Sequence, residues 1–242
     1  MKIEGRNAVS ELLKTDKTVD KILIIKNPQG VLLKIFSEAR KKGIRVQFVD
    51  ERALNRESVE KRHQGVIAFT SDFRYSSLDE ILSSVVDGKG LIILCDGIED
   101  VHNLGSIIRV AECVGANGVI IPTNNSASVT EAVVRISAGA AEHMKVAKVS
   151  SLNRTVDELK KRGFWLYALE ADGKSIYESD LSGNVALVIG GEDSGVKRLT
   201  REKCDFTLAL PLYGSVNSLN ASVALGIAAY EVKFRRAKQA KP

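Results

Sequence analysis

The sequence predicts an α/β protein built on a mostly parallel sheet, and three observations support this. Its apolar runs are continuous rather than alternating, which is typical of strands that are covered on both faces. Segments with helical periodicity fall between these runs. The pattern also starts again after a polar stretch at 71–77, so we expect two domains within the 242 residues.

The first domain is expected over residues 1–70, with helices and strands in strict alternation, beginning with a helix. The predicted elements are a helix near 5–14, a strand at 19–25, a helix from Pro28 to about Lys42, a strand at 44–50, a short helix at 51–58 and a strand at 64–70. The segment SDFRYSS at 71–77 has no periodicity and is predicted to be a linker.

The second domain is expected over residues 78–242 and contains six predicted strands. These strands lie at 90–97, 117–122, 144–149, 164–170, 185–191 and 205–211. The predicted helices lie at 78–86, 103–115, 129–138, 152–162, 198–203 and 218–238. Because ligands bind at the carboxyl ends of parallel strands, the loops at 96–109, 189–196 and 210–222 are the candidate site.

Composition narrows the class of protein. No apolar run reaches the length of a membrane span, and Glu4 and Glu11 interrupt the only segment that could resemble a secretory signal. The three cysteines have neither the number nor the spacing of a disulfide framework or a zinc site. We therefore expect a cytoplasmic protein without a metal and without a membrane partner.

Positive charge is concentrated at the two ends of the sequence. Residues 1–75 carry 16 Lys and Arg against 10 Asp and Glu, whereas residues 76–232 carry 14 against 20. Segregated positive charge favours a nucleic-acid partner, although solvated helix faces would give the same counts. Arg40, Lys41, Lys42, Arg45 and the basic residues of 52–62 are candidates to guide an RNA backbone.

Several familiar chemistries lack their motifs. No G-x-G-x-x-G follows the first strand of the second domain, and the sequence contains no P-loop and no G-x-S-x-G elbow. The three histidines have no metal-binding spacing. What remains is a set of loops rich in Gly, Asn and Ser, with one arginine and one glutamate.

That arginine, Arg109, falls in a helix that is apolar on most sides, so it needs a partner or a cleft. Glu192 could be its partner, either in a structural ion pair or in a catalytic one. Asn103 could be a helix N-cap, Ser218 could cap the last helix, and Asn220 could satisfy loop backbone groups.

Taken in order, these residues resemble a known family. Asn103, Gly105, Ile107 and Arg109 form N-x-G-x-I-x-R, and Gly190-Gly191-Glu192-x-x-Gly195 is a second motif. The third motif is Leu210-Pro211 followed by Ser218-Leu219-Asn220-Ala-Ser222-Val-Ala224. This pattern is similar to the SpoU branch of the SPOUT RNA methyltransferases. The starting segment GRNAVSELL and the segment RHQGVIA at 62–68 resemble an L30e-like substrate-binding domain.

The resemblance implies a fold and a reaction. It implies a deep trefoil knot in the second domain, a homodimer, and methyl transfer from S-adenosyl-L-methionine to a ribose 2'-hydroxyl. The subgroup that the sequence resembles implies that the methylated nucleotide is a guanosine of 23S ribosomal RNA. Transfer RNA as substrate and a non-catalytic, dimeric RNA-binding protein stay open as alternatives.

The resemblance also assigns residues. Gly190, Gly191, Leu210 and Leu219 are implied to bind the cofactor. Arg109 is implied to be the catalytic arginine, with Glu192 orienting it and Asn103, Ser218 and Asn220 positioning the arginine or the ribose. Because a guanidinium keeps its proton at neutral pH, we expect Arg109 to stabilise charge or to clamp a phosphate rather than to act as a base.

Overall fold

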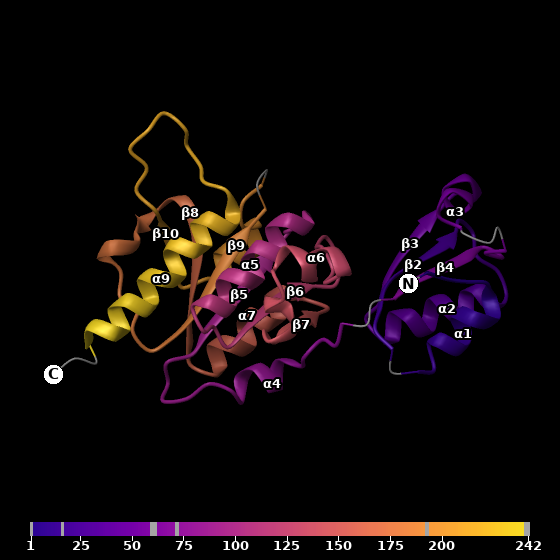
Figure 1. Ribbon diagram of the computed structural model, residues 1–242, viewed down its shortest axis with the longest axis horizontal. Coiled ribbons are helices and arrows are strands. Elements are labelled where there is room, and N and C mark those ends of the chain that lie inside the picture. The colour runs from indigo at the N-terminus through magenta and orange to yellow at the C-terminus, as the bar shows by residue number, and fades with distance from the viewer. Residues whose placement is uncertain (1, 16, 59–61, 71–72, 192–193, 240–242) are drawn as a thin grey trace. The chain divides into compact units, whose positions relative to one another are not determined.

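The computed structural model describes residues 2–15, 17–58, 62–70, 73–191 and 194–239 (Figure 1). The chain divides into two compact units, Met1–Arg74 and Tyr75–Pro242. Each unit has a sheet of its own, of four and six strands respectively.

The first unit is a four-stranded mixed sheet in the order β1-β4-β2-β3. Its strands are β1 (Lys2–Glu4), β2 (Val19–Ile25), β3 (Arg45–Val49) and β4 (Val66–Thr70). Strand β2 pairs with β3 in parallel, and β4 runs antiparallel to both β1 and β2. Its helices are α1 (Arg6–Leu12), α2 (Val31–Lys41) and α3 (Glu51–Glu57).

Helices cover the two faces of this sheet unequally. Side chains of α1 and α2 form one cluster with one face, which includes Val9, Leu32 and Ile22. On the other face the short helix α3 contributes Leu54, which packs on Leu23 and Ile67. The second face is therefore covered only around Leu54, because α3 is seven residues long.

This unit contains one strand that was not predicted, and one of its helices starts later than predicted. Strand β1 was not expected, because three residues carry no periodicity and only pairing with β4 defines the strand. The helix expected from Pro28 begins at Val31, since Gly30 has φ +57° and cannot continue a helix. The other predicted helices and strands of this unit are present with ends shifted by a few residues.

The second unit is a six-stranded sheet in the order β10-β8-β9-β5-β6-β7, and all of its pairs are parallel. The α/β class and the parallel sheet predicted from sequence are thus confirmed. The strands are β5 (Leu91–Asp96), β6 (Gly118–Pro122), β7 (Val146–Val149), β8 (Phe164–Ser175), β9 (Asn184–Gly190) and β10 (Phe206–Ala209).

Strand β8 continues five residues past its predicted end at 170. Its second half pairs with β10 after a register shift between Thr207 and Leu208. The polar sequence of this extension, ADGKS, does not predict a strand, so the pairing partner determines it.

Helices lie on both faces of the second sheet (Figure 1). Helices α4 (Leu78–Leu82) and α7 (Leu152–Lys161) pack on one face, where Ile81 and Val156 join Leu94 and Val188 in a buried cluster. The remaining helices are α5 (Val101–Cys113), α6 (Glu131–Ile136), α8 (Arg198–Lys203) and α9 (Ala221–Gln239), with short 3-10 turns at Ala140–Glu142 and Ile176–Glu178. Helices α5 and α9 lie side by side, and each also contacts the sheet.

Arg236 fixes α9 to the amino ends of two central strands. Its guanidinium donates to the carbonyl oxygens of Lys89, Gly90 and Gly183 over 2.6, 3.0 and 2.8 Å. Burial lowers the pKa of this guanidinium from its ordinary value. Gly90 and Gly183 directly precede β5 and β9, so one side chain joins the last helix to the middle of the sheet.

Two residues of the expected linker lie on the second unit. Ser76 forms a parallel bridge to Ala147 of β7, and its amide donates to the Val146 carbonyl over 2.8 Å. The Tyr75 hydroxyl accepts from the Val129 amide over 2.8 Å. The chain therefore enters the second unit along the edge strand β7.

Candidate active site

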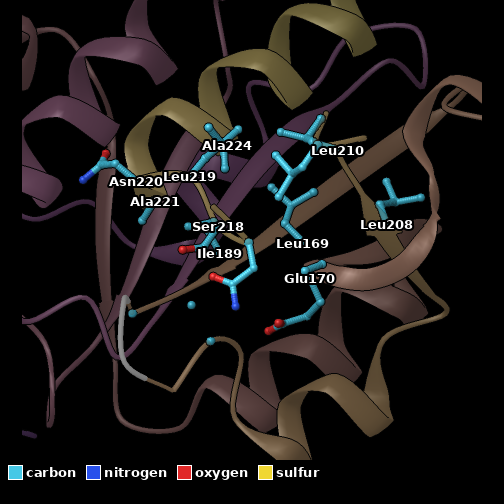
Figure 2. Close-up of a pocket in the computed structure, with 16 residues that line it drawn as sticks. Leu169, Glu170, Ile189, Leu208, Leu210, Ser218, Leu219, Asn220, Ala221 and Ala224 are labelled. Atoms are coloured by element: carbon cyan, nitrogen blue, oxygen red, sulfur yellow. The ribbon is translucent and has the colours of Figure 1, made fainter. Parts of the chain in front are cut away.

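Two of the three loops singled out in the sequence, at 189–196 and 210–222, line one cavity of about 440 Å³ beside the middle of β8 and the carboxyl end of β9 (Figure 2). No described residue of the loop at 96–109 lines this cavity, but Asn103 of that loop is bonded to Asn220 at its edge. Apolar side chains and glycine backbone form most of its wall, with a carboxylate from Glu170. The lining includes Leu169, Ile189, Gly190, Gly191, Gly195, Leu210, Ser218, Leu219, Asn220 and Ala224. Such a wall suits a ligand with an apolar part and no negative charge.

Gly190 makes a tight turn possible after β9. A Cβ atom at this position would lie 1.9 Å from the carbonyl carbon of Gly195, because the loop folds back over it. Gly191 and Gly195 close the turn through an antiparallel bridge, with a 2.9 Å hydrogen bond from the Gly195 amide. Gly190 and Gly191 line the cavity, but the contact that requires glycine at 190 is with the loop itself.

Two carboxylates hold this turn in place. Asp96, at the end of β5, is buried. Its backbone carbonyl accepts a hydrogen bond from the Gly191 amide over 3.2 Å. Its side-chain carboxylate accepts a hydrogen bond from the Lys197 amide over 3.1 Å. The Lys197 ammonium lies 3.4 Å from the same carboxylate. Glu170, near the middle of β8, accepts a hydrogen bond from the Val196 amide. Both ends of the turn are thereby attached to neighbouring strands.

Asn220 joins the first and third loops. Its side-chain amide donates to Oδ1 of the buried Asn103 over 2.8 Å. Its own Oδ1 accepts from the Ser222 amide, over 3.0 Å, and from the Ser222 hydroxyl, over 2.6 Å. Asn220 therefore caps α9, which begins at Ala221.

Two capping expectations were wrong. Ser218 does not cap the last helix, which begins three residues later than predicted because Asn220 takes that role. Asn103 is not an N-cap either, because α5 begins earlier, at Val101. The carboxylate of Asp100 caps α5 and accepts from the Asn103 amide over 2.8 Å.

Both units match family models. Residues 90–230 match the SpoU rRNA Methylase family. The chain belongs to the SpoU family. Residues 2–76 match a second model, described as RNA 2'-O ribose methyltransferase substrate binding. The resemblance inferred from the three motifs is thereby confirmed.

Relatives of full length support the same membership. A Bacillus subtilis protein named for the TrmH family of tRNA/rRNA methyltransferases, YacO, is 40% identical over 237 residues, covering 96% of this chain and 94% of its own length. A Staphylococcus aureus protein named for the same family is 42% identical over 242 residues, covering 97% and 95%.

Solved structures share the fold. The SpoU methyltransferase AviRb from Streptomyces viridochromogenes, in complex with AdoMet, aligns with a TM-score of 0.64 at 24% identity, covering 98% of this chain and 91% of that one. A TrmH-family protein from Porphyromonas gingivalis gives a TM-score of 0.60 at 26% identity, with coverage of 97% and 89%. The A. aeolicus TrmH/SpoU tRNA modifying enzyme gives 0.58 at 28% identity, but covers 66% of this chain and 81% of its own.

Two positions of the first SpoU motif have a packing role. A Cβ at Gly105 would lie 2.6 Å from a methyl group of Ile136, so glycine lets α5 approach α6 closely. Ile107 is fully buried on the same helix. These two residues place α5, whereas Asn103 contributes a polar contact at the site.

The expectation that Arg109 is a buried charge was wrong. Its side chain is exposed on α5, and no residue in the described part of the chain forms a hydrogen bond or ion pair with it. The sequence of α5 is apolar on most sides because the helix packs against α6, α9 and the sheet. Arg109 lies on the side of the helix that faces outward. Glu192, its expected partner, lies outside the described residues.

Sequence reasoning missed Glu170. It follows the apolar run FWLYAL, and a carboxylate directly after an apolar run was the signal that could have identified it. Figure 2 shows its carboxylate on the opposite side of the cavity from Leu210 and Ala224. Glu170 therefore supplies negative charge to the cavity wall.

Among the described residues, no group of three His, Cys, Asp or Glu side chains is placed to hold a metal ion. Within the same ranges, no helix combines the length and apolar character needed to cross a bilayer.

Proposed function

We propose that this SpoU protein transfers a methyl group from S-adenosyl-L-methionine to a ribose 2'-hydroxyl of RNA. The observation that carries the proposal is the meeting of the second and third motif loops at one cavity, with Asn220 of the third loop bonded to Asn103 of the first at its edge. The cavity wall fits the cofactor because the leucines suit its adenosine part and Glu170 complements its positive charge. A phosphate cradle is not needed for such a ligand.

Residue roles follow from position. Gly190, Gly191, Leu210 and Leu219 line the cavity and are proposed to hold the adenosine part, mainly through backbone groups. Leu210 and Leu219 lie on the third loop, which forms another part of the cavity wall. When bound, the cofactor supplies a methyl group on a sulfonium centre, and these four residues orient it.

The remaining motif residues are proposed to act on the RNA. Arg109, whose guanidinium is exposed and permanently charged, clamps a phosphate or stabilises the developing alkoxide of the 2'-hydroxyl. Asn103, Ser218 and Asn220 position the ribose or the arginine. Orientation of Arg109 by Glu192 stays part of the proposal, because Glu192 lies outside the described residues.

Ribosomal RNA is the proposed substrate, with a guanosine of 23S RNA as the target. The match of residues 90–230 to a family described as rRNA methylases supports the choice of ribosomal RNA. The A. aeolicus tRNA modifying enzyme aligns with only 66% of the chain. A transfer-RNA substrate remains the second candidate, since the relatives' names include both classes of RNA.

A homodimer is also proposed, formed through α9. Four exposed apolar side chains lie on one face of that helix at spacings of four, three and four residues: Val223, Ile227, Tyr230 and Phe234. Such a stripe is typical of a surface that another protein covers. Arg109 is exposed on the adjacent helix α5, so a second copy would lie close to the catalytic arginine.

Three further features belong to the proposal. A trefoil knot is supported by the path of α9, which follows the edge strand β10 yet packs beside α5. An L30e-like fold for the first unit is supported by its mixed sheet with helices on both faces. A cytoplasmic location is consistent with an RNA substrate.

The test is methyl transfer by the full chain. Radioactive methyl groups from S-adenosyl-L-methionine should enter unmodified 23S RNA transcripts and should map to one ribose 2'-oxygen. Incorporation into transfer RNA alone would favour the second candidate. RNA binding without incorporation into either RNA would favour a non-catalytic, dimeric RNA-binding protein.

A further inference from the structure

A row of three cations and one aromatic ring crosses the sheet of the first unit. Lys2 of β1 is the register partner of Phe69 in β4, and Phe69 is also the partner of Lys21 in β2. Lys21 in turn pairs with Arg45 of β3. Residues directly opposite one another on neighbouring strands point to the same face, so these four side chains form one row.

This row, called here the cationic row (Lys2, Phe69, Lys21 and Arg45), lies on the face that α1 and α2 do not cover. Lys21 and Phe69 are each two residues from Leu23 and Ile67, which pack on Leu54 of α3. Because α3 covers the sheet around those two residues, the cationic row lies beside the helix and is partly or fully accessible.

The charges of the row are unevenly compensated. Lys2 forms an ion pair with Glu57 over 2.7 Å. The Lys21 ammonium lies 4.4 Å from the centre of the Phe69 ring, which holds it in one place. Within the described ranges, no acidic side chain forms a contact ion pair with Lys21 or Arg45, although the charge of Lys21 acts on the nearby Glu57 carboxylate and contributes to its lowered pKa.

Lys21 and Arg45 are therefore like charges placed directly opposite each other on adjacent strands. Like charges on one face of the sheet repel each other in the free protein. A polyanion that contacts both side chains removes the repulsion and gains two charge-assisted contacts. The excess of basic over acidic residues in 1–75 acts in the same direction.

We propose that the cationic row binds the sugar-phosphate backbone of RNA, with Lys21 and Arg45 contacting phosphates. This proposal rests on the proposed function, since it assigns a surface to the RNA substrate. It keeps Arg45 from the residues expected to guide RNA and adds Lys21, whereas it leaves out the basic residues of α2, because α2 packs on the opposite face of the sheet. The alternative ligand of the cationic row is an acidic segment of a protein, in place of RNA.

The experiment compares two double variants of the full chain that lose the same charge. Lys21→Gln with Arg45→Gln removes the centre of the row, and Lys34→Gln with Lys42→Gln removes two exposed cations on or next to α2. The affinity for an in vitro transcribed 23S RNA is measured over a range of potassium chloride concentrations. Each lost phosphate contact should lower the slope of log affinity against log salt by about 0.7, which gives about 1.4 for the row variant.

The control variant should change the slope by less than half as much. A row variant with the wild-type slope, or a control with an equal loss, would overturn the proposal. So would a row variant that keeps its RNA affinity but no longer binds poly-L-glutamate, since that result assigns the surface to an acidic protein. If the wild type binds RNA through the row but transfers no methyl group, the proposed function fails and the binding surface stands.

A second measurement does not need RNA. Arg45→Gln alone should raise the thermal midpoint of the RNA-free protein, because it removes the repulsion from Lys21, and the gain should shrink at high salt. A lower midpoint would show that Arg45 is stabilised in the free protein, which contradicts the argument for an unpaired cation. The same melting curves establish that the variants fold.

Discussion

The side-chain amide of Asn220 donates to Oδ1 of Asn103 over 2.8 Å, joining two residues that are 117 positions apart. The same Asn220 side chain caps α9 with its oxygen. One residue therefore sets where the last helix begins and ties that helix to the first SpoU motif. The wall of the cavity depends on this link, because Asn220 and Ala224 both line it.

The two roles of Asn220 can be separated by substitution. Asn220→Ser retains a capping oxygen but loses the contact with Asn103, whereas Asn220→Ala loses both. We expect Asn220→Ala to lower the free energy of unfolding by about 1–2 kcal/mol, and Asn220→Ser by less, in urea titrations. Both variants should lose methyl transfer. Full activity of Asn220→Ser would show that the link to Asn103 is not needed.

Gly190 should tolerate no side chain. Gly190→Ala places a methyl group where the Gly195 backbone lies, so the turn must open and the cavity wall is lost. We expect calorimetry to detect little or no binding of S-adenosyl-L-methionine. Gly214→Ala is the matched control, because no atom lies within 4 Å of a Cβ at that position. Similar cofactor affinity in the two variants would contradict the structural role of Gly190.

Arg109 should matter for catalysis but not for folding. Its side chain is exposed and has no partner among the described residues, so Arg109→Ala should leave the urea midpoint and the cofactor affinity nearly unchanged. Methyl transfer should fall by about 100-fold or more, as when a charge-stabilising group is removed. Equal losses of cofactor affinity and transfer would instead mean that Arg109 supports the structure.

The apolar stripe of α9 predicts the oligomeric state. Ile227→Glu places a charge in the middle of the stripe and should convert a dimer to a monomer in sedimentation experiments at micromolar concentration. Leu199→Glu, on the exposed side of α8, is the control and should leave the mass unchanged. A wild-type protein that sediments as a monomer would remove the basis of the proposal.

Glu57 predicts a pH dependence in the first unit. The hydrogen bond from Lys2 lowers the pKa of Glu57 below its ordinary 4.5. Its contribution to stability is thus complete above pH 4.5 and is lost as the pH falls through the lowered folded-state value. Because the pair is partly exposed, Glu57→Gln should cost about 0.5 kcal/mol near neutral pH.

Urea titrations of the wild type and the Glu57→Gln variant at two pH values measure this effect. The difference between them should be clear near neutral pH and should narrow in acid, where Glu57 is protonated in the wild type as well. A difference that is constant over this range would mean that the Lys2–Glu57 pair does not depend on ionisation.

Sequence patterns predicted the central strands well. The runs at 90–97, 117–122 and 185–191 are mostly apolar, and the run at 19–25 is apolar apart from Asp20 and Lys21. The strands found there lie within a residue or so of the predicted ends. Strands defined by a partner were harder to predict. Strand β1 and the second half of β8 carry no apolar pattern and exist because β4 and β10 pair with them.

The site was predicted at the level of loops more accurately than at the level of side chains. The loops at 189–196 and 210–222 meet at the cavity, and Asn103 of the loop at 96–109 is bonded to its edge through Asn220. The exposure of Arg109 could not be predicted, because an apolar helix pattern does not reveal which face remains uncovered. The capping residues were misassigned by a few positions, since Asp, Asn and Ser all cap helices and several occur near each helix start.

The attachment of α9 through Arg236 has a consequence for biosynthesis. The cavity wall includes the first turn of α9. Arg236, which fixes this helix to the sheet, lies nearer the end of α9, and the whole helix follows the last strand in the sequence. The first unit can fold while the rest of the chain is still being translated. The proposed cofactor site cannot form until α9 has left the ribosome, so a nascent chain that still lacks this helix should be inactive.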